Sequence, residues 1–489
     1  MFVALCPAAQ AADEAGGARR PNVLVVLADD LGYGDISCYN QGGFIPTPNH
    51  DRLASQGMLF TDAHSNSAVC SPTRYGLLTG RYAWRTRLQR GVLGGYAVPL
   101  IDEGRTTIGS LLHDQGYATA AVGKWHLGVG WRGSDGEVLG NRAGPNTVDW
   151  DQPLASGPHT LGFDYSLIVP RSFEGGPYCY IENGVVVDAP TGRMEPSPYP
   201  ASWREGPASP GFDQRSGLVE LTRRCEQWIV DQHANAPDQP WMLYFAMTSP
   251  HSPVVPRPPF VGSTPVGAYG DFVVEHDWSL GQLLDTLERT GQIDDTLVIV
   301  TSDNGPARRE AESEDGAQIH VSSGDFRGRK SDIWEGGHRV PFIVRWPGVV
   351  EPGSTSDETI CLTDLLATLA DVTGVTLPDD AGEDSVSILP ALKGESPETP
   401  LREATVLHSL GGVFAIREGR WKLILSGGSG GWTMPDDQIP AGAPDVQLYD
   451  LDADPAEETN VSAEHSDVVE RLRDLLETYR TSNRSTPVE

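Results

Sequence analysis

Four continuous apolar runs alternate with helical patterns along the first three hundred residues. The runs cover residues 22–30 (NVLVVLADD), 117–128, 241–253 and 296–305. Apolar runs of this length are typical of strands that are buried on both faces of a parallel sheet. Two intervening segments, 106–116 and 271–292, have apolar residues at helical spacing and end near Gly116 and Gly291. This alternation predicts an α/β domain with a large, mostly parallel mixed sheet flanked by helices.

The pattern changes near residue 400. The segment PALKGESPETPLRE (390–403) is typical of a boundary. Three short strand patterns follow it, TVLHS (405–409), GVFAIREG and RWKLIL, and then the stretch QLYDLDADPAEETN. A helical pattern then covers 464–480. We expect a smaller α+β C-terminal domain over 401–489, with a short antiparallel sheet and a C-terminal helix, after a main domain over 21–400.

Polar side chains follow each of the four apolar runs. The residues concerned are Asp29, Asp30, Lys124, His126, His251, Asp303 and Asn304. Ligands of open α/β sheets bind outside the carboxyl ends of the strands. One such ending would be an ordinary exposed turn, but four endings of this kind predict a single site at one edge of the sheet.

The charge balance narrows the choice of partners. The 489-residue chain has a formal net charge of -31, and such a surface repels nucleic acids and anionic membranes. Nucleic-acid binding is therefore not expected, and no apolar run is long enough for a membrane span. An anionic substrate would need local cations to overcome the repulsion.

The first 20 residues form a separate segment. MFVALCPAAQAADEAGG contains a short apolar stretch and Ala9-Gln10-Ala11, which resembles a signal-peptidase site. We interpret it as the remnant of a signal peptide, which predicts a periplasmic or secreted protein. The alternative is a disordered cytoplasmic tail.

Among the 6 cysteines, Cys70 has the most ordered surroundings. Cys38, Cys179, Cys225 and Cys361 are interpreted as buried small apolar groups, or at most one or two bridges. In AVCSPTRYGLLTGRY (68–82), Ser71 is predicted to cap a helix, with Pro72 as its first residue and Gly80 at its end. A helix N-terminus and nearby Arg74 would lower the thiol pKa, so a thiolate nucleophile is one hypothesis.

The same stretch resembles the signature of the sulfatase family, Cys-X-Pro-X-Arg followed by Leu-X-Thr-Gly-Arg. Thr73 stands where Ser or Ala is more common in the family. The resemblance continues, in the family's order, at LADDLGYGD, GKWHLG, SPHSP, TSDNGP and GRKSDIWEGGHRVPFIVRWPG, and it covers most of residues 21–350. The complete ordered set is much more specific than any single motif.

The resemblance implies an alkaline-phosphatase-like fold and an enzyme that hydrolyses sulfuric esters. Cys70 would be oxidised to formylglycine by a maturing enzyme, and an oxygen of the hydrated aldehyde would attack sulfur and break the S–O bond. Oxygen donors suit hard cations, and the family implies one Ca²⁺ held at Asp29, Asp30, Cys70, Asp303 and Asn304.

The remaining roles are implied in the same way. Arg74 would hold the formylglycine hydroxyl, and Lys124 and Lys330 would bind the sulfate oxygens. His126 would help to remove a proton when sulfate is expelled, and His251 would protonate the leaving alcohol.

The substrate is less well defined by the sequence. Residues 160–184 resemble a stretch of bacterial carbohydrate sulfatases, which favours a sulfated sugar, and the loops 131–160, 190–212 and 426–445 are interpreted as walls of a cleft. His320, Arg327 and His338 would contact the substrate's ring or serve structural roles. The alternatives are an arylsulfatase, a phosphonate or phosphate monoester hydrolase of the same superfold, and a carbohydrate-binding pseudo-sulfatase, although no ligand or lysine is missing.

Overall fold

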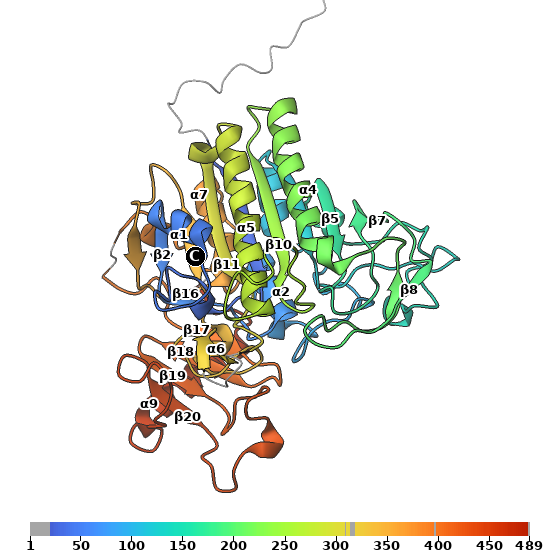
Figure 1. Cartoon of the computed structure of the whole chain (residues 1–489). Helices are drawn as coiled ribbons and strands as arrows, with labels where there is room; N and C mark the ends of the chain where they lie inside the picture. Colours follow the sequence, from blue (N-terminus) through green and yellow to red (C-terminus); the bar gives the residue numbers. More distant parts are fainter. Residues whose placement is uncertain (1–19, 309, 313–317, 396–397, 488–489) are drawn as a thin grey trace, which may run out of the picture.

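The computed structural model describes residues 20–308, 310–312, 318–395 and 398–487, so the predictions for the leader lie outside the described residues. Its centre is a ten-stranded sheet (Figure 1). In spatial order its strands are β15 (Ser354–Ser356), β2 (Met58–Phe60), β14 (Phe342–Arg345), β11 (Thr296–Ser302), β1 (Asn22–Asp29), β10 (Trp241–Pro250), β4 (Ala118–Lys124), β5 (Tyr165–Val169), β6 (Ile181–Glu182) and β7 (Val185–Val186).

The centre of the sheet is parallel. The neighbours β11, β1, β10, β4 and β5 all pair in parallel, whereas β14, β6 and β7 add antiparallel pairs toward the edges. The four apolar runs are therefore adjacent strands, which confirms the predicted sheet. Their carboxyl ends meet at one edge, as expected for parallel strands.

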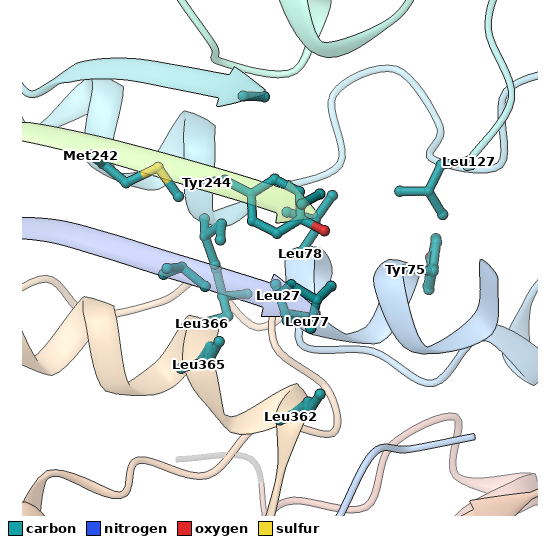
Figure 2. Close-up of a cluster of buried hydrophobic side chains, with 14 of the residues drawn as sticks. Leu27, Tyr75, Leu77, Leu78, Leu127, Met242, Tyr244, Leu362, Leu365 and Leu366 are labelled. Atoms are coloured by element: carbon teal, nitrogen blue, oxygen red, sulfur yellow. The ribbon is translucent and has the colours of Figure 1, made fainter. Parts of the chain in front are cut away.

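Helices cover both faces of the sheet. α1 (Pro48–Ser55), α4 (Gln214–Asn235) and α5 (Ala268–Arg289) pack on one face, and α2 (Cys70–Thr79), α3 (Ile108–Asp114) and α7 (Leu365–Thr373) pack on the other. Side chains of β1 alternate between the two cores, with Leu24 and Val26 in one and Leu27 in the other. Figure 2 shows Leu27 and Tyr244 of the sheet in one cluster with Leu77 and Leu78 of α2 and Leu366 of α7.

The C-terminal region forms the expected α+β unit, below the large sheet in Figure 1. β17 (Thr405–His408), β18 (Phe414–Glu418), β19 (Trp421–Ile424) and β20 (Gln447–Asp450) form an antiparallel sheet in that order. α9 (Ser466–Thr481) packs on β18 and β19. The fold class is confirmed, whereas the boundary at residue 400 stays a prediction.

The ends of the predicted helices agree with the structure within a few residues. Gly116 and Gly291, just beyond α3 and α5, both have positive φ, which glycine adopts at low cost. α1, α4 and α7 were not predicted. The loop 190–212 contains a small hairpin of β8 (Gly192–Met194) and β9 (Gly206–Ala208). None of the described helices is long and apolar enough to cross a membrane.

Candidate active site

The carboxyl ends of β1 and β4 are joined by a buried ion pair. Lys124, the last residue of β4, donates from Nζ to Asp29 Oδ1 at 2.7 Å, and both side chains are fully buried. Lys330 reaches the same edge from a loop, with its Nζ 2.7 Å from Asp30 Oδ1. The predicted meeting of the strand ends at one site is therefore observed.

A third ion pair completes this edge. Arg74 of α2 donates from Nη2 and Nε to Asp303 Oδ2, at 2.7 and 3.0 Å. Asp303 Oδ1 accepts from the backbone N–H of Asp30 at 3.1 Å. Asp30 has a φ of 67°, a conformation that side chains other than glycine seldom adopt and that concentrates at functional sites. The three carboxylates are thus balanced by three permanent cations.

These contacts shift the pKa values of the pairs. Burial alone would raise the pKa of Asp30, but Lys330 and His251 outweigh it and hold the carboxyl pKa below its usual value. The pKa of Asp29 is lowered in the same way by Lys124 against the effect of burial. Burial would lower the pKa of Lys330, yet Asp30 raises it above its usual value. All three groups therefore stay ionised at neutral pH.

Cys70 is the first residue of α2, and its Sγ lies 3.8 Å from Asp29 Oδ1. The prediction that Ser71 caps this helix is wrong: the cap position is Val69, and α2 begins before Pro72. The Ser71 hydroxyl instead donates to the backbone oxygen of His126 at 2.8 Å and accepts from the N–H of Leu93 at 3.0 Å. This residue ties α2 to the loop after β4. Gly80, with a φ of 63°, ends the helix as predicted.

The expectation of an acidified thiol is also wrong. Burial raises the pKa of Cys70 to about 12, although Lys124 and Lys330 act in the opposite direction. An unmodified thiol at this position is therefore neutral near pH 7 and a poor nucleophile. This finding removes the support for a simple thiolate hydrolase.

Two histidines at this edge of the sheet each have one ring nitrogen hydrogen-bonded to a backbone carbonyl. His126 Nε2 lies 2.6 Å from the backbone oxygen of Leu93, so it donates, and buried Nδ1 has no partner among the described residues. Burial lowers the pKa of His126 well below its usual value. His251 Nδ1 donates to the Ser252 carbonyl at 2.6 Å, and its Nε2 lies 3.7 Å from Asp30 Oδ2. Each ring therefore has one nitrogen fixed and the other available for proton transfer.

The oxygen donors at this edge fit a hard cation. Asp29 Oδ2 and Asn304 Oδ1 are buried and have no hydrogen-bond partner among the described residues. Asn304 is held in place because its Nδ2 donates to Asp30 Oδ1 at 2.8 Å. Ligand atoms of Asp29, Asp30, Cys70 and His251 lie within 4.8 Å of one another. Unsatisfied buried oxygens are costly, and a divalent cation would satisfy them.

Two of the histidines near Lys330 have structural surroundings. His320 Nε2 lies 2.8 Å from Asp35 Oδ1 in the interior. His338 lies in a buried cluster at the junction with the C-terminal sheet, 2.9 Å from Lys422 Nζ and 3.0 Å from His64. Lys422 occupies this cluster, so it does not resemble an open metal site. The structural hypothesis is favoured for both histidines.

Some of the surroundings of the site were not predicted. The loop after β5 carries Arg171 and Glu174, which form an ion pair. Burial would raise the pKa of Glu174, but His251 and Arg171 lower it, which places this carboxyl in the electrostatic field of the site. The polar sequence PRSFEGG (170–176), directly after an apolar run, could have indicated that these residues lie near the site.

The cysteines Cys38, Cys70, Cys179, Cys225 and Cys361 are free, so the described residues contain no disulfide.

An α/β sheet with a buried cysteine, three carboxylates and three cations at its carboxyl edge defines a hydrolase of anionic esters. Comparison with known proteins identifies the family. The family model "Sulfatase" matches residues 21–375, and "N-sulphoglucosamine sulphohydrolase, C-terminal" matches residues 328–482. The chain belongs to the sulfatase family, and it is a sulfuric ester hydrolase.

Individual relatives agree with this assignment. The chain is 33% identical over 512 residues to N-acetylgalactosamine-6-O-sulfatase of Bacteroides thetaiotaomicron, covering 96% of this chain and 95% of the relative. It is 32% identical to human arylsulfatase A, covering 94% and 87%. A solved sulfatase from a study of glycosaminoglycan metabolism by B. thetaiotaomicron is 33% identical, with a TM-score of 0.80 and coverage of 95% and 100%.

Proposed function

We propose that this chain is a formylglycine- and Ca²⁺-dependent sulfatase that cleaves the S–O bond of a carbohydrate O-sulfate. The observation that carries the proposal is the position of Cys70, with Sγ 3.8 Å from Asp29 Oδ1, among cations that a sulfate group requires. The atom Sγ stands for an oxygen of the modified side chain. When present, a hydrated formylglycine supplies an oxygen nucleophile that the neutral thiol does not supply.

Asp29, Asp30, Asp303 and Asn304, with the side chain at position 70, would hold the metal. Ca²⁺ suits a site built only from oxygen donors, and when bound it supplies positive charge that polarises the nucleophile and a sulfate oxygen. Because the three carboxylates and three cations already balance, a divalent ion would leave the site with a net charge of about +2. That charge would attract a sulfate monoester, which is an anion.

The basic side chains then divide the remaining work. The ammonium groups of Lys124 and Lys330 bind sulfate oxygens and stabilise the charge that develops in the transition state. His251, whose Nε2 lies 3.7 Å from Asp30 Oδ2, gives a proton from Nε2 to the leaving alcohol oxygen. His126 accepts a proton at Nδ1, because its Nε2 is already committed to the Leu93 carbonyl. Arg74 orients Asp303 and the start of α2.

A carbohydrate is favoured over an aryl sulfate because the relative that matches along 96% of this chain is named as an N-acetylgalactosamine-6-O-sulfatase. We further propose that a formylglycine-generating enzyme converts Cys70 in a periplasmic or secretory compartment, because the first residues resemble a signal peptide. The second candidate is an arylsulfatase, since human arylsulfatase A is 32% identical.

The test measures free sulfate by ion chromatography after incubation with sulfated galactosamine, glucosamine, galactose and fucose oligosaccharides, an aryl sulfate and an aryl phosphonate. The protein is made in a host that converts Cys70, and the peptide mass at position 70 confirms conversion. We expect release from one sugar and position, no release by Cys70→Ala, and unchanged release by Cys225→Ala, which alters another buried free cysteine. Hydrolysis of the phosphonate alone, or no release by converted protein, would contradict the proposal.

A further inference from the structure

A cavity of about 1080 Å³ is lined in part by residues 327–329, which directly precede Lys330 in the chain. Its lining includes Arg308, Arg329, Trp432 and Thr433, together with the carboxylates Asp325 and Glu458. Pockets of several hundred Å³ accommodate ligands larger than a single sulfate group. The cavity therefore has room for a sugar residue, whereas the catalytic groups at the strand ends are buried.

The walls of this cavity are fixed to the catalytic loop by hydrogen bonds. The backbone N–H of Lys330 donates to the Pro306 carbonyl at 2.9 Å, which holds the segment that carries Arg308. The N–H of Trp432 donates to Ser331 Oγ at 2.9 Å, and the N–H of Thr433 donates to Asp332 Oδ1 at 3.0 Å. Segments far apart in the sequence are thus clamped onto the two residues that follow Lys330.

The arginine side chains that line the cavity differ in their interaction partners. Arg327 is committed to the interior, because its guanidinium stacks 3.6 Å from the Trp334 ring centroid and donates to the Glu457 carbonyl at 2.6 Å. Arg329 Nη1 donates to the Ala307 carbonyl at 3.3 Å, but among the described residues no carboxylate lies within ion-pair distance of its guanidinium. The guanidinium is 5.7 Å from the Trp432 ring centroid. A guanidinium in this position can make a paired hydrogen bond to an added carboxylate or sulfate.

An exposed aromatic ring lies close to each of the arginines Arg308 and Arg329. Trp432 is 46% exposed, and Tyr199, whose ring lies 3.9 Å from the Arg308 guanidinium, is 50% exposed. The loop that carries Tyr199 is linked to the His251 segment, because the N–H of Val254 donates to the Pro200 carbonyl at 3.1 Å. Exposed aromatic rings offer flat apolar faces to the C–H face of a sugar ring. Arginine and aromatic groups together fit a sugar that carries a negative charge.

We propose that this cavity is a second anion-binding subsite, which takes the carboxylate or sulfate group of the sugar residue next to the one whose sulfate is cleaved. Arg329 is its main anion ligand, Trp432 supports the sugar ring, and Arg308 adds positive charge. Asp325 and Glu458 on the same lining are available to sugar hydroxyl groups. The subsite makes the preferred substrate an acidic oligosaccharide, in a chain whose net charge of -31 otherwise repels one. This inference rests on the proposed function.

The test compares kcat/KM for two matched disaccharides with the same sulfated head sugar, one with a neutral hexose as its neighbour and one with a uronic acid. A third disaccharide with a sulfated neighbour distinguishes the two sources of charge. We expect wild type to prefer at least one charged neighbour by about tenfold at low salt, since one good charge-assisted contact is worth about that factor. The preference should fall as salt rises.

Two variants and a matched control locate the effect. Arg329→Gln should reduce the preference for the charged neighbour to about twofold or less, whereas Trp432→Ala should lower kcat/KM for the charged and neutral disaccharides alike. The control is Arg420→Ala. The Arg420 guanidinium also lies near a tryptophan, 4.8 Å from the Trp421 ring centroid, but it does not line this cavity. This variant should leave the preference for the charged neighbour unchanged.

The outcomes separate the inference from the proposed function. Equal kcat/KM for the charged and neutral disaccharides in converted wild type would overturn the subsite while leaving the sulfatase intact. A preference that survives Arg329→Gln, or unchanged kcat/KM for both disaccharides in Trp432→Ala, with wild-type thermal stability in each case, would also overturn it. Failure of converted wild type to release sulfate from the head sugar alone and from all disaccharides would instead contradict the proposed function.

Discussion

Lys124 Nζ lies 2.7 Å from Asp29 Oδ1, although the two residues end strands that are separated by β10 in the sheet. The long lysine side chain crosses the end of the intervening strand, and both partners are fully buried. This pair links the cation that is proposed to bind sulfate to the carboxylate that is proposed to bind metal. A substitution of Lys124 should therefore also affect metal binding at Asp29, and a substitution of Asp29 should affect sulfate binding at Lys124.

We expect Lys124→Met to reduce kcat by about 10²- to 10³-fold, because it removes a donor to the charge that develops in the transition state. It also leaves the Asp29 carboxylate buried without its main partner, which should destabilise the fold by about 3–5 kcal/mol. Urea denaturation and steady-state kinetics measure the two effects. Lys393→Met, which changes an exposed lysine after α8 (Leu389–Leu392), is the control. Wild-type stability of Lys124→Met in the presence of a chelator would contradict this account of the pair.

The unpartnered oxygens of Asp29 and Asn304 predict a stabilising metal. Adding Ca²⁺ to chelator-treated protein should raise the free energy of unfolding by about 3–4 kcal/mol at 100–1,000 times Kd. Asn304→Ala should lose most of this gain, because it removes one oxygen ligand. Differential scanning calorimetry with and without Ca²⁺ measures the shift. An equal calcium-induced gain in Asn304→Ala and in wild type would show that the metal binds elsewhere.

The effect of replacing His251 on the rate of sulfate release should increase with the pKa of the leaving alcohol. His251→Asn removes the proton donor, so sulfate release from an alcohol should fall by about 10²- to 10⁴-fold. An aryl sulfate with an acidic phenol as the leaving group needs little protonation and should lose much less. A plot of log(kcat/KM) against leaving-group pKa should become steeper in the variant. Parallel plots for the variant and wild type would assign His251 a role other than general acid.

Buried neutral histidines should make the fold sensitive to acid. Burial lowers the pKa of His276 to about 3 and that of His408 to about 4. Because the unfolded imidazole has a pKa of about 6.5, the unfolded state binds more protons below that pH. The stabilisation is complete above about pH 6.5 and is lost as the pH falls toward the folded pKa, by up to about 1.4 kcal/mol per pH unit for each histidine.

Comparison of His408→Asn with wild type isolates this effect from the change in overall charge. The free energy of unfolding should fall less steeply between pH 6.5 and pH 4.5 in the variant. Denaturant titrations at several pH values provide the measurement, and identical slopes for the two proteins would contradict the assignment.

The sequence predicted the parallel core and its ligand edge because both depend on local patterns. Apolar runs identified β1, β4, β10 and β11, and the polar residues at their ends led to the proposed site. A helix N-terminus near Cys70 was also predicted, but with Ser71 as the cap and Pro72 as the first residue, whereas α2 begins at Cys70 after Val69. Ser71 has a residue type that favours capping, and its hydroxyl is instead used by the loop after β4, a contact that sequence spacing does not reveal.

The thiol pKa of Cys70 and the cavity lined by Arg329 and Trp432 also could not be predicted, because both depend on contacts between distant parts of the chain. The helix N-terminus and Arg74 suggested an acidified thiol, but complete burial dominates at Cys70. Arg329 and Trp432 are about one hundred positions apart and meet only because the Trp432 backbone is bonded to Ser331. Burial and long-range contacts of this kind depend on the packing of the whole fold.

The central claim is that position 70 acts only after conversion of its thiol. The most direct test prepares the same chain with different degrees of conversion, by varying the supply of the formylglycine-generating enzyme, and measures the initial rate of sulfate release per chain. Peptide mass spectrometry gives the converted fraction at Cys70. We predict a straight line through zero, because the buried thiol is neutral and inactive. An appreciable rate from fully unconverted protein would contradict the account.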